Sequence, residues 1–303
     1  MLSSAQRWKR YRYEWVAAVG ATQFLGDLGG RNQIGSDYFF DLDAASTRYV
    51  LNAGIRYKVS QYVSVKTGLS VGELSADDKY TQEPWRNNRN LRFRSPIVEW
   101  ATQVEVSWMR ETIGSRYKIR RVRGRGRKGS NIYVYGFAGV ALLYMNPMGQ
   151  YNGKWYSLKP LHTEGQGFVP SRKEYSNWQF TIPFGVGIKY AIDKKSSIGL
   201  EYGLRKTFTD YIDDTSTSYV YTKQGERKGQ YSPGVLAQWD DVSKALADPS
   251  LDIAPKDLDL FTGACSACPG QQRGDPTDLD SYMFLLITYN RKIRTTRKGL
   301  PKF

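Results

Sequence analysis

Long segments in which apolar and polar residues strictly alternate constrain the fold of this chain more than any other feature of its sequence. In residues 178–192 every even-numbered residue is apolar, and the odd-numbered residues between them include Gln179, Thr181 and Lys189. A period of two places successive side chains on opposite faces of a β-strand. This segment is therefore predicted to form a long strand with one apolar face.

Seven further segments either alternate in the same way or are apolar on both faces. Most of the predicted strands exceed the ~5–6 residues usual in soluble sandwiches and reach the ~9–11 residues that a tilted strand needs to cross a bilayer. No apolar run approaches the ~18 residues of a membrane-spanning helix, which excludes a helical membrane protein. The eight predicted strands cover residues 13–25, 48–59, 63–72, 97–108, 132–145, 178–192, 198–204 and 282–289.

The connections between these strands alternate between short and long. A tight turn at Ser60 and Gln61 and the short segment 193–197 contrast with long connections after the first, third, fifth and seventh strands. In outer-membrane barrels the short turns face the periplasm and the long loops face outward. The sequence therefore predicts an all-β fold: an eight-stranded antiparallel up-and-down transmembrane β-barrel in a bacterial outer membrane, with long extracellular loops and both termini in the periplasm.

Positive charge is concentrated in three parts of the chain. The protein has 44 Lys and Arg against 29 Asp and Glu, a net charge of +15, and the acid-free segments 1–13, 112–130 and 291–303 hold this excess. An even number of strands places both termini and the turn containing residues 112–130 at the periplasmic end. Such a basic face suits an acidic protein, anionic lipid or nucleic acid, or is only solvated. The residues predicted to contact a periplasmic protein partner are Arg120, Arg121, Arg123, Arg125, Arg127, Lys128, Arg294, Arg297 and Lys298.

The inward-facing positions of the predicted strands carry charges of both signs. The lumen of an eight-stranded barrel is only wide enough for side chains to fill it. An unpaired buried charge costs several kcal/mol, so these residues are expected to pair with one another and to plug the lumen, although a conduction path or proton relay is an alternative. The predicted lumen charge network consists of Glu14, Arg48, Arg56, Lys66, Glu99, Glu105, Lys189, Glu201 and Arg205.

Few residues are suited to catalysis or metal binding. Cys265 and Cys268 have CxxC spacing, but a second pair is missing, so a local disulfide is expected rather than a zinc site. His162 is the only histidine, and no catalytic function, metal or cofactor is predicted. Six aspartates could coordinate a cation, but they lack EF-hand spacing and are typical of turns. They are Asp210, Asp213, Asp214, Asp275, Asp278 and Asp280.

The two ends of the chain and its last long loop give weaker signals. Ser3, Ser4 and Ala5 resemble a signal-peptidase site, so we expect a signal-peptide remnant at residues 1–5, a barrel at 6–291 and a basic periplasmic tail at 292–303. In the last loop, apolar residues at helical spacing predict a helix that ends before Pro249 and caps the barrel mouth. These residues are Val235, Leu236, Trp239, Val242 and Leu246.

A series of short motifs between residues 11 and 291 resembles a Bacteroidota outer-membrane barrel family, the one that includes PorG of the type IX protein secretion system. The resemblance rests on their order along the chain as well as on their residues. The motifs are Phe24–Gly30, Asp77–Tyr80, Arg89–Pro96, Pro160–Gly167, Ile182–Ile188, Arg205–Asp214 and Gln271–Gly274.

This resemblance implies an outer-membrane anchor that contacts a periplasmic ring formed by PorK-like lipoproteins and PorN-like proteins. It implies no catalysis, no cofactor and no small-molecule substrate. A stand-alone barrel that binds a ligand or surface glycan through its loops is the alternative, with Trp85, Trp155 and Trp239 as residues that can stack on sugars. A soluble all-β nucleic-acid binder is a third alternative, and the stretch Arg123–Arg127 resembles an RNA-binding RG segment.

Overall fold

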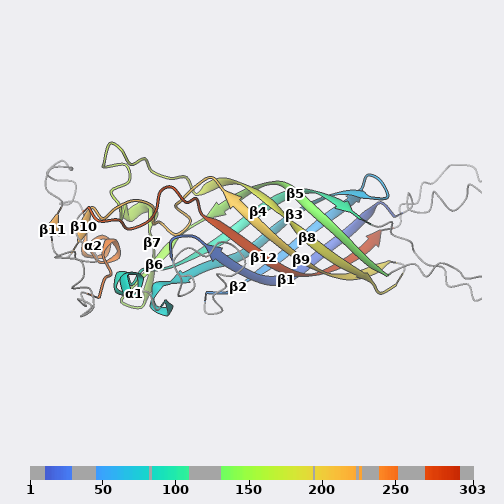
Figure 1. The fold of residues 1–303 in the computed structure, drawn as a ribbon, viewed down its shortest axis with the longest axis horizontal. Helices are drawn as coiled ribbons and strands as arrows, with labels where there is room; N and C mark the ends of the chain where they lie inside the picture. Colours follow the sequence, from blue (N-terminus) through green and yellow to red (C-terminus); the bar gives the residue numbers. More distant parts are fainter. Residues whose placement is uncertain are drawn as a thin grey trace, which may run out of the picture.

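Eight long strands close into a single antiparallel barrel, and the long connections gather at one of its ends (Figure 1). The computed structural model describes residues 11–28, 46–81, 84–108, 131–193, 195–222, 225–226, 239–251 and 270–293. Each strand pairs with the next barrel strand along the chain, and the last strand pairs with the first to close the barrel. The predicted eight-stranded antiparallel up-and-down barrel is thus confirmed.

The barrel strands agree closely in position with the alternating segments of the sequence. The last strand ends at Ile293, two residues beyond the boundary expected for the barrel. The strands are β1 (Tyr13–Leu25), β2 (Arg48–Lys58), β3 (Val63–Asp77), β4 (Arg92–Ser107), β5 (Ile132–Met145), β8 (Trp178–Ala191), β9 (Ser196–Thr207) and β12 (Ser281–Ile293).

β3 and β4 extend farther toward the loop end than the sequence predicted. Beyond Gly72, the last residues of β3 are buried on both faces, from Leu74 to Asp77, so the alternation disappears. At the start of β4 the residues pointing away from the lumen include Arg92 and Arg94 rather than apolar residues. The apolar pattern marks only the part of each strand that needs an apolar exterior.

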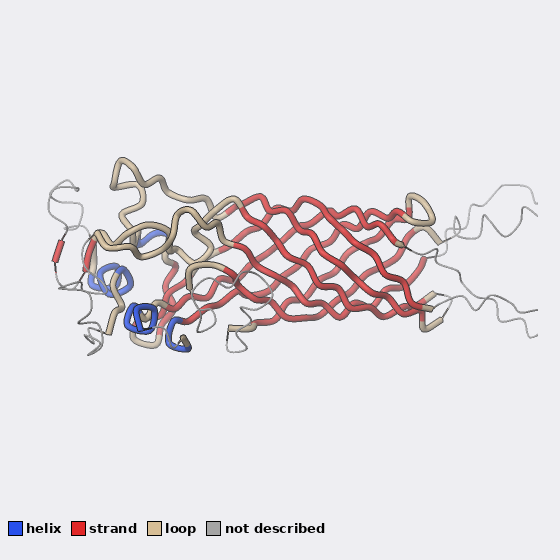
Figure 2. Tube along the Cα trace, in the orientation of Figure 1, coloured by secondary structure: helices blue, strands red, loops and turns tan. Residues whose placement is uncertain are grey.

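The elements at the loop end are short. A hairpin of β6 (Met148–Tyr151) and β7 (Lys154–Ser157) follows β5 and pairs with the start of β4. Strand β10 (Tyr221–Thr222) pairs with β11 (Gly225–Glu226). The helices η3 (Asp78–Tyr80), α1 (Pro84–Arg89), η4 (Lys159–Leu161) and α2 (Asp241–Ala247) lie at the same end (Figure 2). None of the described helices has the length and apolar character needed to cross a membrane.

Helix α2 is shorter than the helix that the sequence predicted. Its amino-terminal cap is Asp240, whose carboxylate accepts a hydrogen bond from the Ser243 amide at 2.7 Å. A capping aspartate of this kind fixes the start of a helix, so Trp239 lies outside it. Val235 and Leu236 are outside the described residues. The main contacts of α2 are with β6 and β10 rather than with the barrel strands, so it caps the hairpin and not the mouth directly.

The exterior of the barrel carries a belt of exposed apolar side chains. Trp100 of β4 and Phe180 of β8 remain 61% and 70% exposed, and residues of the other strands continue the belt around the barrel. Exposed aromatic residues lie toward both ends, including Trp15 and Tyr289 at one end and Trp178 at the other. A water-soluble protein rarely exposes so continuous an apolar surface, whereas a lipid-facing surface requires one with aromatic residues near both interfaces.

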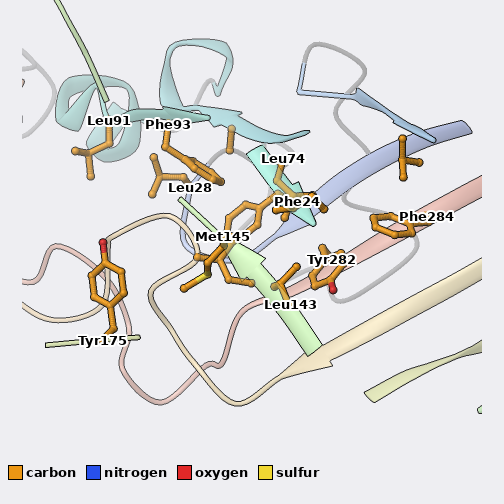
Figure 3. Packing of buried hydrophobic residues seen from close by; sticks show 14 of the residues in the cluster. Phe24, Leu28, Leu74, Leu91, Phe93, Leu143, Met145, Tyr175, Tyr282 and Phe284 are labelled. Carbon is orange, nitrogen blue, oxygen red and sulfur yellow. The ribbon is translucent and has the colours of Figure 1, made fainter. Parts of the chain in front are cut away.

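The interior divides into two halves. The half nearer the loops holds an apolar cluster from several strands, in which Phe24 and Phe93 meet edge to face with ring centroids 4.9 Å apart (Figure 3). Leu74, Leu143, Met145 and Phe284 are buried in the same cluster. The other half, nearer Tyr13 and Ile293, is polar and charged. An apolar plug therefore closes the loop end of the lumen.

Candidate functional site

Most of the charged residues predicted to face the lumen are inside it. Arg48 is the exception, because its side chain lies near the loop end, is 33% exposed and pairs with Glu73 at 3.5 Å. Lys189 is half-buried. The other seven are buried: Glu14, Arg56, Lys66, Glu99, Glu105, Glu201 and Arg205.

Arg56 is the centre of this charge network. Its Nε and Nη2 atoms donate to the two carboxylate oxygens of Glu105 at 2.6 and 2.9 Å. Its Nη1 atom donates to Glu14 at 3.0 Å and to the side-chain oxygen of Asn290 at 2.6 Å. The fork geometry of guanidinium matches a carboxylate with two parallel hydrogen bonds. One fully buried side chain from β2 thereby ties together β1, β4 and β12 across the lumen.

A second group of ion pairs lies next to the first. The Nζ atom of Lys66 donates to both carboxylate oxygens of Glu201, at 2.6 and 2.7 Å, and the Tyr135 hydroxyl donates to the same carboxylate at 3.0 Å. Lys66 is also 4.0 Å from Glu105, which connects the two groups. β3, β5 and β9 are thereby joined to the strands that Arg56 connects.

The third group lies closest to the apolar plug. Arg205 is 3.4 Å from Glu99, and its guanidinium carbon sits 3.9 Å from the ring centroid of Phe284. The Tyr282 hydroxyl donates to Glu99 at 2.6 Å. The Arg205 guanidinium therefore contacts both a carboxylate of the charged half and an aromatic ring of the apolar plug.

Two lysines that face the lumen were not among those predicted from the sequence. Lys58 is 2.8 Å from Glu14, and Lys292 is buried near the same end. Lys58 lies two residues after Arg56, and Lys292 lies two residues after Asn290, and both of these neighbours face inward. The two-residue alternation of a strand therefore already indicates that both lysines face the lumen. Lys292 was predicted to belong to the basic tail at 292–303, whereas it lies in β12.

A small cavity lies in the charged half among the described residues. A cavity of about 40 Å³ lies between Glu14, Lys58, Glu105 and Lys189. A water molecule occupies about 30 Å³ of liquid, so this space holds on the order of one water. Chemically, the arrangement fixes the strands to one another and leaves little space for a solute.

The predicted partner-binding residues lie outside the described part of the chain. These are Arg120, Arg121, Arg123, Arg125, Arg127, Lys128, Arg294, Arg297 and Lys298, and the same is true of Cys265 and Cys268 and of residues 1–5. The strands to which the basic segments are attached are described. Tyr13 of β1 pairs with Ile293 of β12, and Ser107 of β4 pairs with Tyr135 of β5 at the same end of the barrel. All three segments therefore leave from the end opposite the long loops.

At the loop end, residues of the quoted motifs come together from distant parts of the chain. Arg89 pairs with Asp78 at 2.7 Å and donates to the backbone carbonyls of Asp27 and Arg273. Arg273 pairs with Glu164 at 3.1 Å and donates to the Asp214 carbonyl. No role was predicted for Arg89, Glu164 or Arg273 from the sequence, although all three belong to the quoted motifs. Arg89, which is partly buried, and Arg273, which is fully buried, connect the loops to one another.

The aspartates considered as cation ligands have individual environments. Burial raises the pKa of Asp213 and Asp280 well above the usual range, and their mutual repulsion adds to the effect for Asp213. Burial also raises the pKa of Asp214 to about 6, although Arg273 and hydrogen bonds from Thr163 and Tyr175 lower it. In the described residues no three acidic, histidine or cysteine side chains are arranged to hold a metal ion.

The three tryptophans named as residues that can stack on sugars differ in their surroundings. Trp239 is buried against Tyr221, with ring centroids 6.2 Å apart, so this prediction is wrong for that residue. The ring of Trp155 is already contacted by the guanidinium groups of Arg92 and Arg94, at 5.2 and 4.2 Å from its centroid. The side chain of Trp85 is outside the described part.

No protein-family model and no curated protein matches the sequence. Among solved structures, the chain is similar to Neisserial surface protein A, with 7% identity, a TM-score of 0.37 and coverage of 93% of this chain and 96% of that one. It is also similar to Ail of Yersinia pestis, with 8% identity, a TM-score of 0.36 and coverage of 93% of this chain and 99% of that one. The outer membrane protein OprG of Pseudomonas aeruginosa is similar with 8% identity, a TM-score of 0.36 and coverage of 94% of this chain and 98% of that one. At this level the likeness concerns the fold alone. The chain is an eight-stranded antiparallel barrel with an apolar exterior and a lumen filled by ion pairs.

Proposed function

We propose that this protein is a non-conducting outer-membrane barrel that serves as an anchor for a periplasmic protein assembly. The observation that carries the proposal is the filled lumen. Arg56, Lys66 and Arg205 each pair with buried carboxylates from other strands. Above them, the apolar cluster occupies the loop end. A barrel closed by two successive plugs is suited to holding a position in the membrane rather than to passing solutes.

The proposed membrane location rests on the exterior. Apolar side chains surround the barrel, and exposed aromatic residues lie near both of its ends. The only ordered membrane structures that satisfy every backbone hydrogen bond are helices and closed barrels. Among these, closed barrels with an apolar belt and aromatic girdles are typical of the bacterial outer membrane.

The proposed partner is the periplasmic ring of a type IX secretion system, built from proteins like PorK and PorN. Two arguments support it. The ordered motifs resemble the PorG family, and three basic segments leave from one end of the barrel. If that end faces the periplasm, its charge would steer and orient an acidic partner during docking. Arginine predominates in the 112–130 segment, and arginine pairs with carboxylates through two hydrogen bonds more readily than lysine does.

Co-purification of periplasmic proteins with charge variants tests this proposal. The variant replaces Arg120, Arg121, Arg123, Arg125 and Arg127 with serine. The expected result is normal barrel assembly, weaker recovery of the ring proteins and a residual association that is less sensitive to salt. The control replaces Lys79, Lys154 and Lys173, which are exposed at the loop end, and should leave recovery unchanged. Unchanged recovery with unchanged salt dependence in the arginine variant would overturn the proposed docking face.

A further inference from the structure

Two arginines, Arg92 and Arg94, lie on the outward face of β4 at the loop end of the barrel. Along the rest of this face, every outward residue from Val98 to Trp108 is apolar except Thr102. At a rise of ~3.4 Å per residue and a strand tilt of ~35–45°, this apolar part extends about 25 Å along the barrel axis, which matches the apolar band of outer-membrane barrels. The two arginines therefore lie just beyond the lipid-facing band.

Aromatic residues of the neighbouring strands mark where that band ends. Val98 pairs with Tyr144 of β5, which pairs with Trp178 of β8, and the two aromatic rings lie 5.1 Å apart. Tyrosine and tryptophan are enriched where hydrocarbon meets headgroups. Arg94 is two outward positions beyond Val98, roughly 10 Å farther along the axis, and a headgroup layer is about 5–8 Å thick. Because a long arginine side chain can bend toward that layer, its guanidinium group reaches the depth of the headgroups.

The two arginines contact one aromatic ring. Strand β6 pairs with the start of β4, and β7 pairs with β6, so Trp155 of β7 lies beside the arginines at the loop end (Figure 1). The guanidinium carbons of Arg92 and Arg94 are 5.2 and 4.2 Å from the ring centroid of Trp155. Stacking on a ring orients a planar guanidinium group and leaves the N–H groups at its edge available. Two positive groups are thus held close together on the outside of the protein.

The positive charge of this pair is only partly compensated. Arg92 Nε is 3.2 Å from Asp77, and its Nη1 atom donates to the Gln150 side chain at 2.6 Å. Arg94 makes no hydrogen bond or ion pair with any described residue. None of its nitrogen atoms is among the buried polar atoms that lack a partner, so these donors are open to the surroundings. Two guanidinium groups with one paired carboxylate leave an excess of positive charge.

We propose that Arg94 and Arg92 bind a phosphate group of a glycolipid in the outer leaflet of the outer membrane. This inference rests on the proposed membrane location, with the loop end facing outward. The N–H groups of Arg94 form a fork that matches two oxygens of a phosphate group. The depth of the pair selects a lipid as the source of that phosphate, because an acidic protein or a nucleic acid would have to enter the headgroup layer to reach it.

Native mass spectrometry of the full chain in dodecyl maltoside micelles tests this binding. Diphosphorylated lipid A should bind with at least tenfold higher affinity than the same lipid without its phosphates. The double variant Arg92→Gln with Arg94→Gln should bind the diphosphorylated lipid at least tenfold more weakly than wild type. Gel mobility before boiling verifies that the variant is folded. Arg48→Gln is the matched control, since Arg48 is another partly exposed arginine near the loop end but pairs with Glu73, and it should bind normally.

Equal affinity of the wild-type protein for the two forms of the lipid would overturn the proposal, and this comparison requires no variant. Equal affinity of the double variant and wild type for the diphosphorylated lipid would also overturn it. Displacement of the lipid by excess inorganic phosphate would indicate a site for free phosphate and would contradict the lipid assignment. The basic segments leave from the opposite end of the barrel, and their test is the recovery of periplasmic proteins. Failure of the lipid proposal is therefore distinguishable from failure of the docking function.

Discussion

Replacement of Glu201 by alanine should strongly destabilise the barrel. Its carboxylate accepts both short hydrogen bonds of Lys66 and one from the Tyr135 hydroxyl. Without it, Lys66 keeps only a 4.0 Å approach to Glu105, whose carboxylate already pairs with Arg56. Breaking a buried ion pair by removing one partner costs about 3–5 kcal/mol, because the other charge stays buried. We expect a loss of this size for Glu201→Ala.

The measurement is equilibrium unfolding in urea of the barrel in detergent micelles, followed by tryptophan fluorescence. Glu73→Ala is the matched control, since Glu73 pairs with Arg48 near the loop end and both side chains are partly exposed. An exposed pair of this kind contributes about 0–1 kcal/mol. The double variant Lys66→Met with Glu201→Ala should recover part of the loss, because no uncompensated charge remains at this pair. A loss for Glu201→Ala no larger than that for Glu73→Ala would refute the role given to the network.

Two further predictions concern the loop end and the exterior. Burial raises the pKa of Asp210 to about 8 and of Asp27 to about 6, so the folded loops bind protons more tightly than the unfolded chain. Stability of the loop end should therefore be greatest below about pH 4 and fall as the pH rises through 6 to 8. Near-ultraviolet circular dichroism of the stacked Tyr175 and Tyr211 rings reports unfolding of the loop end. If the loop end resisted unfolding better at pH 8 than at pH 4, this prediction would be contradicted. The apolar belt predicts that the folded protein needs detergent or lipid and migrates differently in gels before and after boiling. A monodisperse species in plain buffer would contradict the membrane location.

The sequence predicted the barrel because each spanning strand has a local signature. β8 alternates without interruption, and its range in the structure differs from the predicted one by a single residue, Ala191 in place of Ile192. Strand parity likewise placed Arg56 and Glu201 inside the lumen. What parity cannot give is the choice of partners, because Arg56 reaches Asn290 across more than two hundred residues of chain.

The loop end was less predictable for the same physical reason. Arg89 and Arg273 join segments that are far apart in the sequence, and no local period records such a contact. Trp239 was expected on a helix and near a ligand, yet the helix begins only after the Asp240 cap, and apolar neighbours bury the Trp239 ring.

The most direct test of the central claim is single-channel recording of the folded protein in planar bilayers. Incorporation of the folded barrel is first verified by its gel mobility before boiling. A lumen closed by ion pairs at one half and by the Phe24 and Phe93 cluster at the other predicts no stable conductance steps. Reproducible unitary steps from the folded protein, with a size that changes in Glu201→Ala, would show that ions pass through the lumen and would contradict the account.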